Sequence, residues 1–293
     1  SCLFHQPLLL YLHMADRCVV ANMQDDSSSF EAWALSFKRW LPNVDHVELS
    51  WDAPADIRHT HYQRFLFRVQ QFSALFSDWF SVSSQQNRGD LTCLRTNGAS
   101  HLVVTAPKGD RSTKPDNACS TLDDAISNES KLECYIRDNP QPLAELLGVH
   151  NLDRQLPVGL FENEVKEGSE IFPRASSMID LWGLGDDKLF LFELKAEGNR
   201  KVGIMSELFF YSYIILGVQD GRYSLEDRNT TISETKAVRM YALAPKLHPL
   251  IDARMLEMAN TAFRSSDMNI RFGIIQIDHG EQYPFTLEMD ARE

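Results

Sequence analysis

The chain of 293 residues has few cysteines, and none of them lie close together. Its five cysteines are widely scattered, and no Cys-x-x-Cys spacing occurs. The sequence therefore predicts neither a disulfide framework nor a zinc site. Scattered, unpaired cysteines are typical of a protein that works in a reducing compartment.

Long apolar runs are also missing. The longest early run, PLLLYL at 7–12, is far too short to cross a bilayer, which takes about 20 apolar residues. It also lacks the basic start that a signal peptide carries. We therefore expect no membrane partner and a cytoplasmic location.

Positive charge is in deficit, because the formal net charge is −12 at pH 7. A broad nonspecific nucleic-acid surface is normally basic, so this balance counts against one. It does not exclude a nuclease, because metal ions can bridge an acidic site to phosphate.

What the chain does contain is an alternation of strand and helix patterns, which predicts an α/β fold. Apolar residues at helical spacing predict helices over 30–41, 63–80, 131–139, 202–216 and 249–263. Short apolar or alternating runs predict strands over 18–23, 44–51, 91–95, 102–105, 160–171, 238–244, 270–277 and 285–289. We interpret the aromatic stripe of 63–80 as core packing rather than as a platform for stacked bases.

A polar stretch divides the chain. Residues 108–130, KGDRSTKPDNACSTLDDAISNES, have few large apolar side chains and are typical of a loop or linker. We predict an N-terminal α/β domain of unknown role over 1–110, a linker over 111–130 and a second domain over 131–293.

The segment MIDLWGLGDDKLFLFELK, at 178–195, predicts a hairpin with charges inside its strands. If residues 185–188 form the turn, Asp180 and Glu193 lie directly opposite each other across the two strands. Side chains alternate between the faces of a strand, which places Lys195 on the same face as Glu193. The opposite face is uniformly apolar and suits packing against helices.

Two carboxylates opposite each other repel unless a cation lies between them. Oxygen ligands from Asp180 and Glu193, with a backbone carbonyl and water, suit Mg²⁺ or Mn²⁺. Lys195 can stabilise charge on a phosphate and orient or help to deprotonate the attacking water. The combination indicates metal-assisted phosphodiester hydrolysis. A salt-bridged strand end is the alternative, because four other Asp/Glu-x-Lys strings occur in the chain.

These residues resemble the core motif of the PD-(D/E)xK (restriction-endonuclease-like) nuclease superfamily. In that motif a strand with Asp, a turn, and a strand with Glu/Asp-x-Lys follow one another, and IDLWGLGDDKLFLFELK matches it at Asp180, Glu193 and Lys195. The resemblance covers roughly 131–280 and is closest to NucS-like and RecB-type nuclease domains. It implies a C-terminal mixed sheet flanked by helices and preceded by a smaller α/β domain. It also implies a Mg²⁺ (or Mn²⁺) ion held by Asp180, Glu193 and the carbonyl of Leu194.

Neighbouring segments extend the resemblance. LECYIRDNPQPLAELLG is similar to the opening helix of the NucS-like branch and offers Glu133. RecB-type members carry Gln-hydrophobic-x-x-Tyr after the lysine strand, where this chain has ELFFY, so Glu207 replaces the usual Gln. VRMYALAP resembles a further strand of the same core. The resemblance implies that Glu133 and Glu207 complete the acidic shell and that Tyr211 contacts substrate.

Three basic residues flank the charged strands. Arg174, Arg200 and Lys201 could contact a phosphate backbone, and solvated surface positions are the alternative. We expect an endonuclease whose partner is nucleic acid, DNA rather than RNA, with a homodimer as a further option. The competing function is a noncatalytic nucleic-acid- or protein-binding module that retains the nuclease fold.

Overall fold

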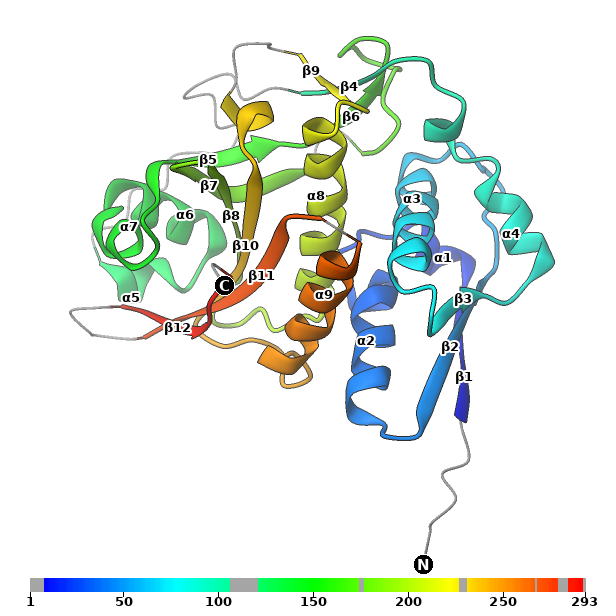
Figure 1. Cartoon of the computed structure of the whole chain (residues 1–293), viewed down its shortest axis with the longest axis horizontal. Helices are drawn as coiled ribbons and strands as arrows, with labels where there is room; N and C mark the ends of the chain where they lie inside the picture. The colour runs from blue at the N-terminus through cyan, green and yellow to red at the C-terminus, as the bar shows by residue number, and fades with distance from the viewer. Residues whose placement is uncertain are drawn as a thin grey trace, which may run out of the picture.

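The computed structural model of the protein describes residues 8–105, 121–173, 177–226, 231–266, 268–278 and 284–291. Its main sheet has six strands in the order β12-β11-β10-β8-β7-β5 (Figure 1). The strands are β5 (His150–Pro157), β7 (Met178–Gly185), β8 (Lys188–Leu194), β10 (Ala237–Ala244), β11 (Ile270–Ile277) and β12 (Phe285–Met289). The central strands β8, β10 and β11 run parallel, and the outer strands are antiparallel to their neighbours.

Helices cover both faces of this sheet (Figure 1). One face carries α8 (Gly203–Gln219) and α9 (Ala253–Ser265), and the other carries α5 (Leu122–Ala125), α6 (Glu129–Asp138) and α7 (Gln141–Leu147). The central strand β10, AVRMYALA, is buried along its whole length. A nearly continuous apolar run is what a parallel strand covered on both faces requires. The predicted mixed α/β class is confirmed, and the finer restriction-endonuclease-like arrangement stays a prediction.

The helix α8 lies at the centre of the molecule. Its sequence, GIMSELFFYSYIILGVQ, is apolar on nearly all sides, and almost every residue is buried. A helix that is hydrophobic all round has to be enclosed. Here the main sheet packs on one side of α8, and two helices of the N-terminal region, α2 (Phe30–Trp40) and α3 (Thr60–Leu75), pack on the other.

The N-terminal region forms a second, three-stranded parallel sheet in the order β1-β2-β3. It contains β1 (Leu8–Met14), β2 (Val44–Trp51), β3 (Phe80–Val82), α1 (Asp16–Val19) and α4 (Gln85–Leu91), besides α2 and α3. Aromatic rings join this region to α8: the Phe72 and Phe209 ring centroids lie 5.5 Å apart, and those of Phe67 and Phe210 lie 6.1 Å apart. The predicted core role of the aromatic stripe is confirmed, because Phe65, Phe72 and Phe76 are buried.

A small third sheet links the two halves of the chain. Its strands are β6 (Leu160–Glu162), β4 (Leu102–Val104) and β9 (Ser224–Leu225), in that order. Three short 3₁₀ helices complete the described elements: η1 (Asp26–Ser28), η2 (Arg95–Asn97) and η3 (Thr231–Glu234). The predicted boundary between 1–110 and 131–293 stays a prediction. The first half of the predicted linker, 111–120, lies outside the described residues, and its second half, 121–130, contains α5 and the start of α6. No helix in the described ranges is long and apolar enough to cross a membrane.

Two predicted strands are wrong. Residues 18–23 contain the end of α1 and a turn, and residues 91–95 contain the end of α4 and the start of η2. Both are short apolar runs, and periodicity alone cannot separate a short strand from a buried helical turn.

Other predicted elements have different bounds. The helix predicted over 63–80 ends at Leu75, and its last predicted residue, Phe80, begins β3. The strand predicted over 160–171 is limited to β6, while β1 and β5 were not predicted as strands. The polar sequence of β5, HNLDRQLP, contains Asn151 and Gln155 at positive φ, so it lacks the even alternation that marks a strand.

Candidate functional site

The hairpin of β7 and β8 has the predicted register. Gly185 pairs with Lys188 across a two-residue turn, and the pairing continues to Leu181 and Phe192. One more step of this register brings Asp180 opposite Glu193, as the sequence predicts. The expected alternation of faces also places Lys195, just beyond β8, beside Glu193.

The backbone of Leu194 faces Asp180. Its N–H donates to Oδ2 of Asp180 over 2.9 Å, whereas the N–H of Lys195 donates to Leu243 on β10 over 3.0 Å. The N–H and C=O of one strand residue point to the same side of the strand. The carbonyl of Leu194 is therefore directed toward β7, where the Asp180 carboxylate lies.

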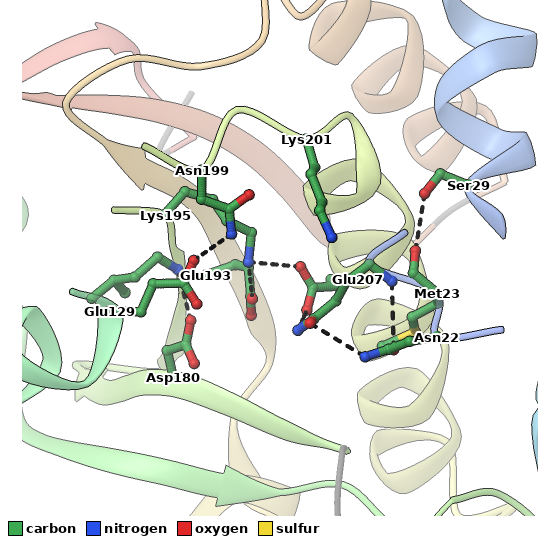
Figure 2. A network of polar contacts seen from close by, with 12 residues as sticks. Asn22, Met23, Ser29, Glu129, Asp180, Glu193, Lys195, Asn199, Lys201 and Glu207 are labelled. Atoms are coloured by element: carbon green, nitrogen blue, oxygen red, sulfur yellow. Dashed lines mark hydrogen bonds and ion pairs between the residues drawn. The ribbon is translucent and has the colours of Figure 1, made fainter. Parts of the chain in front are cut away.

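Lys195 connects the hairpin to α8 (Figure 2). Its Nζ lies 2.8 Å from Oε1 of Glu193 and 2.9 Å from Oε2 of Glu207. All four side chains of this cluster are buried, with exposed fractions of 6% for Asp180, 2% for Glu193, 3% for Lys195 and 0% for Glu207. The structure thus brings together four of the residues predicted for the site.

The cluster holds more negative than positive charge. Its three carboxyl groups share one ammonium, and Oε2 of Glu193 accepts no hydrogen bond from the part of the chain that is described. Burial raises the pKa of Glu193 well above its ordinary value, and the neighbouring Asp180 and Glu207 raise it further, against a smaller opposing effect of Lys195. The Glu193 carboxyl therefore needs either a proton or an additional cation.

Lys195 is held in its charged form. Burial alone lowers the pKa of this ammonium, but Glu193, Glu207 and Asp180 together raise it well above the ordinary value. An ammonium donates hydrogen bonds and has no lone pair. In this arrangement Lys195 can stabilise negative charge and orient a water molecule, but it cannot take a proton from one.

The N-terminal region contributes side chains that the sequence did not predict. Gln24, in the loop between α1 and η1, donates from Nε2 to Oε1 of Glu207. Arg64 of α3 is fully buried and interacts electrostatically with Glu207 and Tyr211. No local pattern marks either residue, because Gln24 lies in a polar loop and Arg64 in an otherwise ordinary amphipathic helix. Only tertiary packing brings them to the cluster.

Glu133, predicted to complete the acidic shell, is held by strand β5. Its Oε2 accepts a hydrogen bond from Gln155 over 2.6 Å and lies 3.3 Å from Nε of Arg154. Glu133 and Arg154 are both buried, so they form an enclosed ion pair between α6 and β5. A place for Glu133 in the acidic shell stays a prediction.

Tyr211, predicted to contact substrate, is enclosed under the sheet. Its hydroxyl donates to the carbonyl of Met178 over 3.0 Å and so ties α8 to the first residue of β7. Burial, followed by the charges of Glu193 and Glu207, raises the pKa of this phenol well above its ordinary value. These contacts give Tyr211 a part in aligning α8 with the hairpin, and contact with substrate stays a prediction.

The three predicted phosphate contacts are placed differently. Arg174 lies outside the described residues. Arg200 is exposed in the loop before α8. Lys201 pairs with Asp25 over 2.8 Å, and both side chains are about half exposed, at 46% each. Both described residues are open to solvent, and Lys201 is close enough to Lys195 for their charges to interact.

The donor set fits a magnesium ion of the kind used in phosphate chemistry. Across the described ranges, no three His, Cys, Asp or Glu side chains gather as a complete metal site. Mg²⁺ at such sites takes only one or two carboxylates, keeps several waters and uses substrate phosphates for the rest. Asp180, Glu193 and the Leu194 carbonyl meet that smaller requirement. Among the described residues no donor reaches Oε2 of Glu193, and this is the observation that fits a cation at this place.

Comparison with known proteins adds no assignment: no protein-family model, no curated protein and no solved structure matches this chain.

Proposed function

We propose that this chain is a Mg²⁺-dependent nuclease that hydrolyses phosphodiester bonds of nucleic acid at the hairpin site. We take the substrate to be DNA rather than RNA and the cut to be endonucleolytic, as the motif resemblance implies. The observation that carries the proposal is the enclosed pair of Asp180 and Glu193, in which one oxygen of Glu193 accepts no hydrogen bond from the described residues. Buried carboxylates are costly unless they are paired or bind a metal.

Each residue of the cluster has a role in this proposal. Asp180, Glu193 and the carbonyl of Leu194 would hold the ion. A bound divalent ion supplies Lewis-acid polarisation of the phosphate and a lowered pKa for bound water. Lys195 contributes a fixed positive charge beside the position of the phosphate and donates a hydrogen bond that orients the attacking water.

The direct test is cleavage of a panel of DNA and RNA substrates, single- and double-stranded, with Mg²⁺ or Mn²⁺ against EDTA. Wild-type protein should cleave at least one substrate with metal and none with EDTA. Lys195→Ala should lower the rate about 10²- to 10³-fold, the usual loss for a donor that stabilises transition-state charge. Lys188→Ala is the matched control, because Lys188 ends another Asp-x-Lys string, lies in the same hairpin and pairs only loosely with Asp187 at 3.6 Å.

The proposal fails if no substrate in the panel is cut with either metal. It also fails if Lys195→Ala cleaves as fast as the wild type, because the charge of Lys195 is then irrelevant to the reaction.

A second candidate is a noncatalytic module that retains the nuclease fold. The observation in its favour is enclosure: the four charged side chains of the cluster are at most 6% exposed, and Lys195 already pairs with two of the acids. Calorimetric titration with Mn²⁺ separates the two candidates. Heat of binding that Asp180→Asn abolishes supports the nuclease, and the absence of any heat with the wild type supports the module.

A further inference from the structure

A short segment of the N-terminal region lies on the start of α8, next to the acidic cluster. Asp26 accepts a hydrogen bond from the N–H of Val202 over 3.0 Å, and the neighbouring Asp25 pairs with Lys201. The contact extends to the backbone: a Cβ added to Gly203 would lie 2.8 Å from the Cα of Gln24 and closer still to its carbonyl group. Only glycine therefore permits this approach.

Gln24 carries this contact into the cluster itself. Its amide donates to one oxygen of the Glu207 carboxylate, and the other oxygen of that carboxylate pairs with Nζ of Lys195. Lys195 in turn holds Glu193. Figure 2 shows Asn22 and Met23 of the same segment beside Glu207, on the side away from Asp180. Glu207 is fully buried, so its carboxylate depends on donors from the protein such as the amide of Gln24.

We propose that Gln24 is a positioning residue of the hairpin site: it fixes the carboxylate of Glu207, which holds the ammonium of Lys195 beside Glu193. This inference rests on the proposed nuclease function. It assigns the N-terminal region a share in the site, because without Gln24 the buried Glu207 carboxylate has lost its amide donor. A hydrogen bond to a charged carboxylate is about twice as strong as one between neutral groups and fixes its geometry closely.

The segment has other anchors, so the amide of Gln24 can be tested separately from the fold of the segment. The hydroxyl of Ser29 donates to the carbonyls of Met23 and Asp25, over 3.0 and 2.8 Å. The contacts of Asp25 and Asp26 with α8 do not involve the Gln24 side chain. A change confined to that side chain should leave the path of the loop intact.

The test compares four full-length proteins: wild type, Gln24→Glu, Glu207→Gln and the double variant. Gln24→Glu sets two carboxylates against each other and should lower kcat at least about tenfold, the scale of a hydrogen bond to a charged group, with KM within about twofold. The double variant exchanges the amide and the carboxylate. The amide at position 207 then donates to the carboxylate at position 24 and accepts from Lys195, so kcat should recover at least about fivefold over Gln24→Glu alone.

Asp25→Asn is the matched control, because it alters the adjacent side chain, which contacts the exposed Lys201 and not Glu207. Its kcat should stay within about twofold of the wild type. Unfolding curves of all variants identify any loss of fold, and their double-mutant cycle measures the coupling of Gln24 to Glu207 independently of activity.

The outcomes separate this inference from the proposed function. If the wild type cleaves and Gln24→Glu keeps the wild-type kcat, Gln24 is merely structural and the inference is overturned while the nuclease stands. Failure of the double variant to recover, or an equal loss in Asp25→Asn, overturns it as well. If the wild type cleaves no substrate, the proposed function fails first and the inference fails with it.

Discussion

Replacing Glu193 by glutamine should stabilise the metal-free protein at neutral pH. Glu193 is buried beside two other acids, Asp180 and Glu207, and the charge of Lys195 offsets only part of their effect on its pKa. Glutamine has the same shape and can still accept a hydrogen bond from Lys195. Glutamine is neutral at every pH, so the variant folds without taking up a proton at this position and without burying a third negative charge, whereas the wild type must do one or the other.

The magnitude follows from proton linkage. Folding raises the pKa of Glu193 well above its ordinary value of 4.5. At a pH between 4.5 and the raised pKa of the native state, the native protein therefore binds more protons than the unfolded chain. The free energy of unfolding therefore falls as pH rises through this window, by up to about 1.4 kcal/mol per pH unit for one proton. Between pH 5 and pH 7 the advantage of Glu193→Gln over the wild type should grow, by at most about 3 kcal/mol for one proton over two pH units.

Urea unfolding in EDTA at pH 5, 6 and 7 measures this difference. Titration of groups outside the cluster cancels when the variant is compared with the wild type at each pH. Glu145→Gln is the control, because it removes an exposed carboxyl on α7 and should give no pH-dependent difference. A Glu193→Gln protein that is less stable than the wild type at pH 7, or a difference that does not grow with pH, would refute the reasoning. The Glu193 carboxylate would then be satisfied by its ion pair with Lys195.

Three other changes have definite expected results. Mn²⁺ at about a hundredfold excess over its Kd should raise the free energy of unfolding of the wild type by about 2.7 kcal/mol, and Asp180→Asn should abolish this gain. An equal gain in the wild type and in Asp180→Asn would contradict a metal site at the hairpin. Arg68→Ala should lower the free energy of unfolding by about 3–5 kcal/mol, measured in urea, because the buried Glu31 loses its ionic partner, and a loss below about 1 kcal/mol would contradict this reason. Burial and the charge of Arg64 lower the pKa of His61 from about 6.5 to about 4. The native protein therefore binds fewer protons than the unfolded chain between these values, and its free energy of unfolding decreases as pH falls from about 6.5 to 4. His61→Gln should flatten that decline in thermal unfolding, and an unchanged decline would exclude His61 as its source.

Elements with a clear local sequence pattern could be predicted from the sequence. The strand predicted over 44–51 coincides with β2, and that over 285–289 coincides with β12. The hairpin of β7 and β8 was predicted with its register, because the polar pair Asp186 and Asp187 marks the turn and strict alternation then fixes every pair. Even alternation of apolar residues and a clear turn signal are therefore enough to predict a hairpin and its register.

Elements that depend on tertiary packing were not predicted. The apolar run of β1 carries no turn signal and pairs only with β2, which runs parallel to it and follows only after α1, η1 and α2. Strand β5 is polar and irregular, and its pairing with β7 is what makes it a strand. In both cases the partner strand, rather than the local sequence, decides the structure.

The residues of the site also fall into those that local sequence predicts and those that only tertiary packing brings together. Asp180, Glu193 and Lys195 belong to one hairpin, so local geometry was enough to bring them together. Glu207 was predicted from the motif on the following helix. Gln24, by contrast, is 183 residues from Glu207 in sequence, and no spacing rule reaches that far. The contacts of the N-terminal region with α8 were visible only once the fold was known.

The central claim is that the hairpin acids hold a divalent metal ion. Anomalous diffraction from crystals soaked in Mn²⁺ tests it most directly. We expect a single strong anomalous peak between Asp180 and Glu193, within coordination distance of the Leu194 carbonyl. The absence of a peak there, with Lys195 still pairing both Glu193 and Glu207, would contradict it.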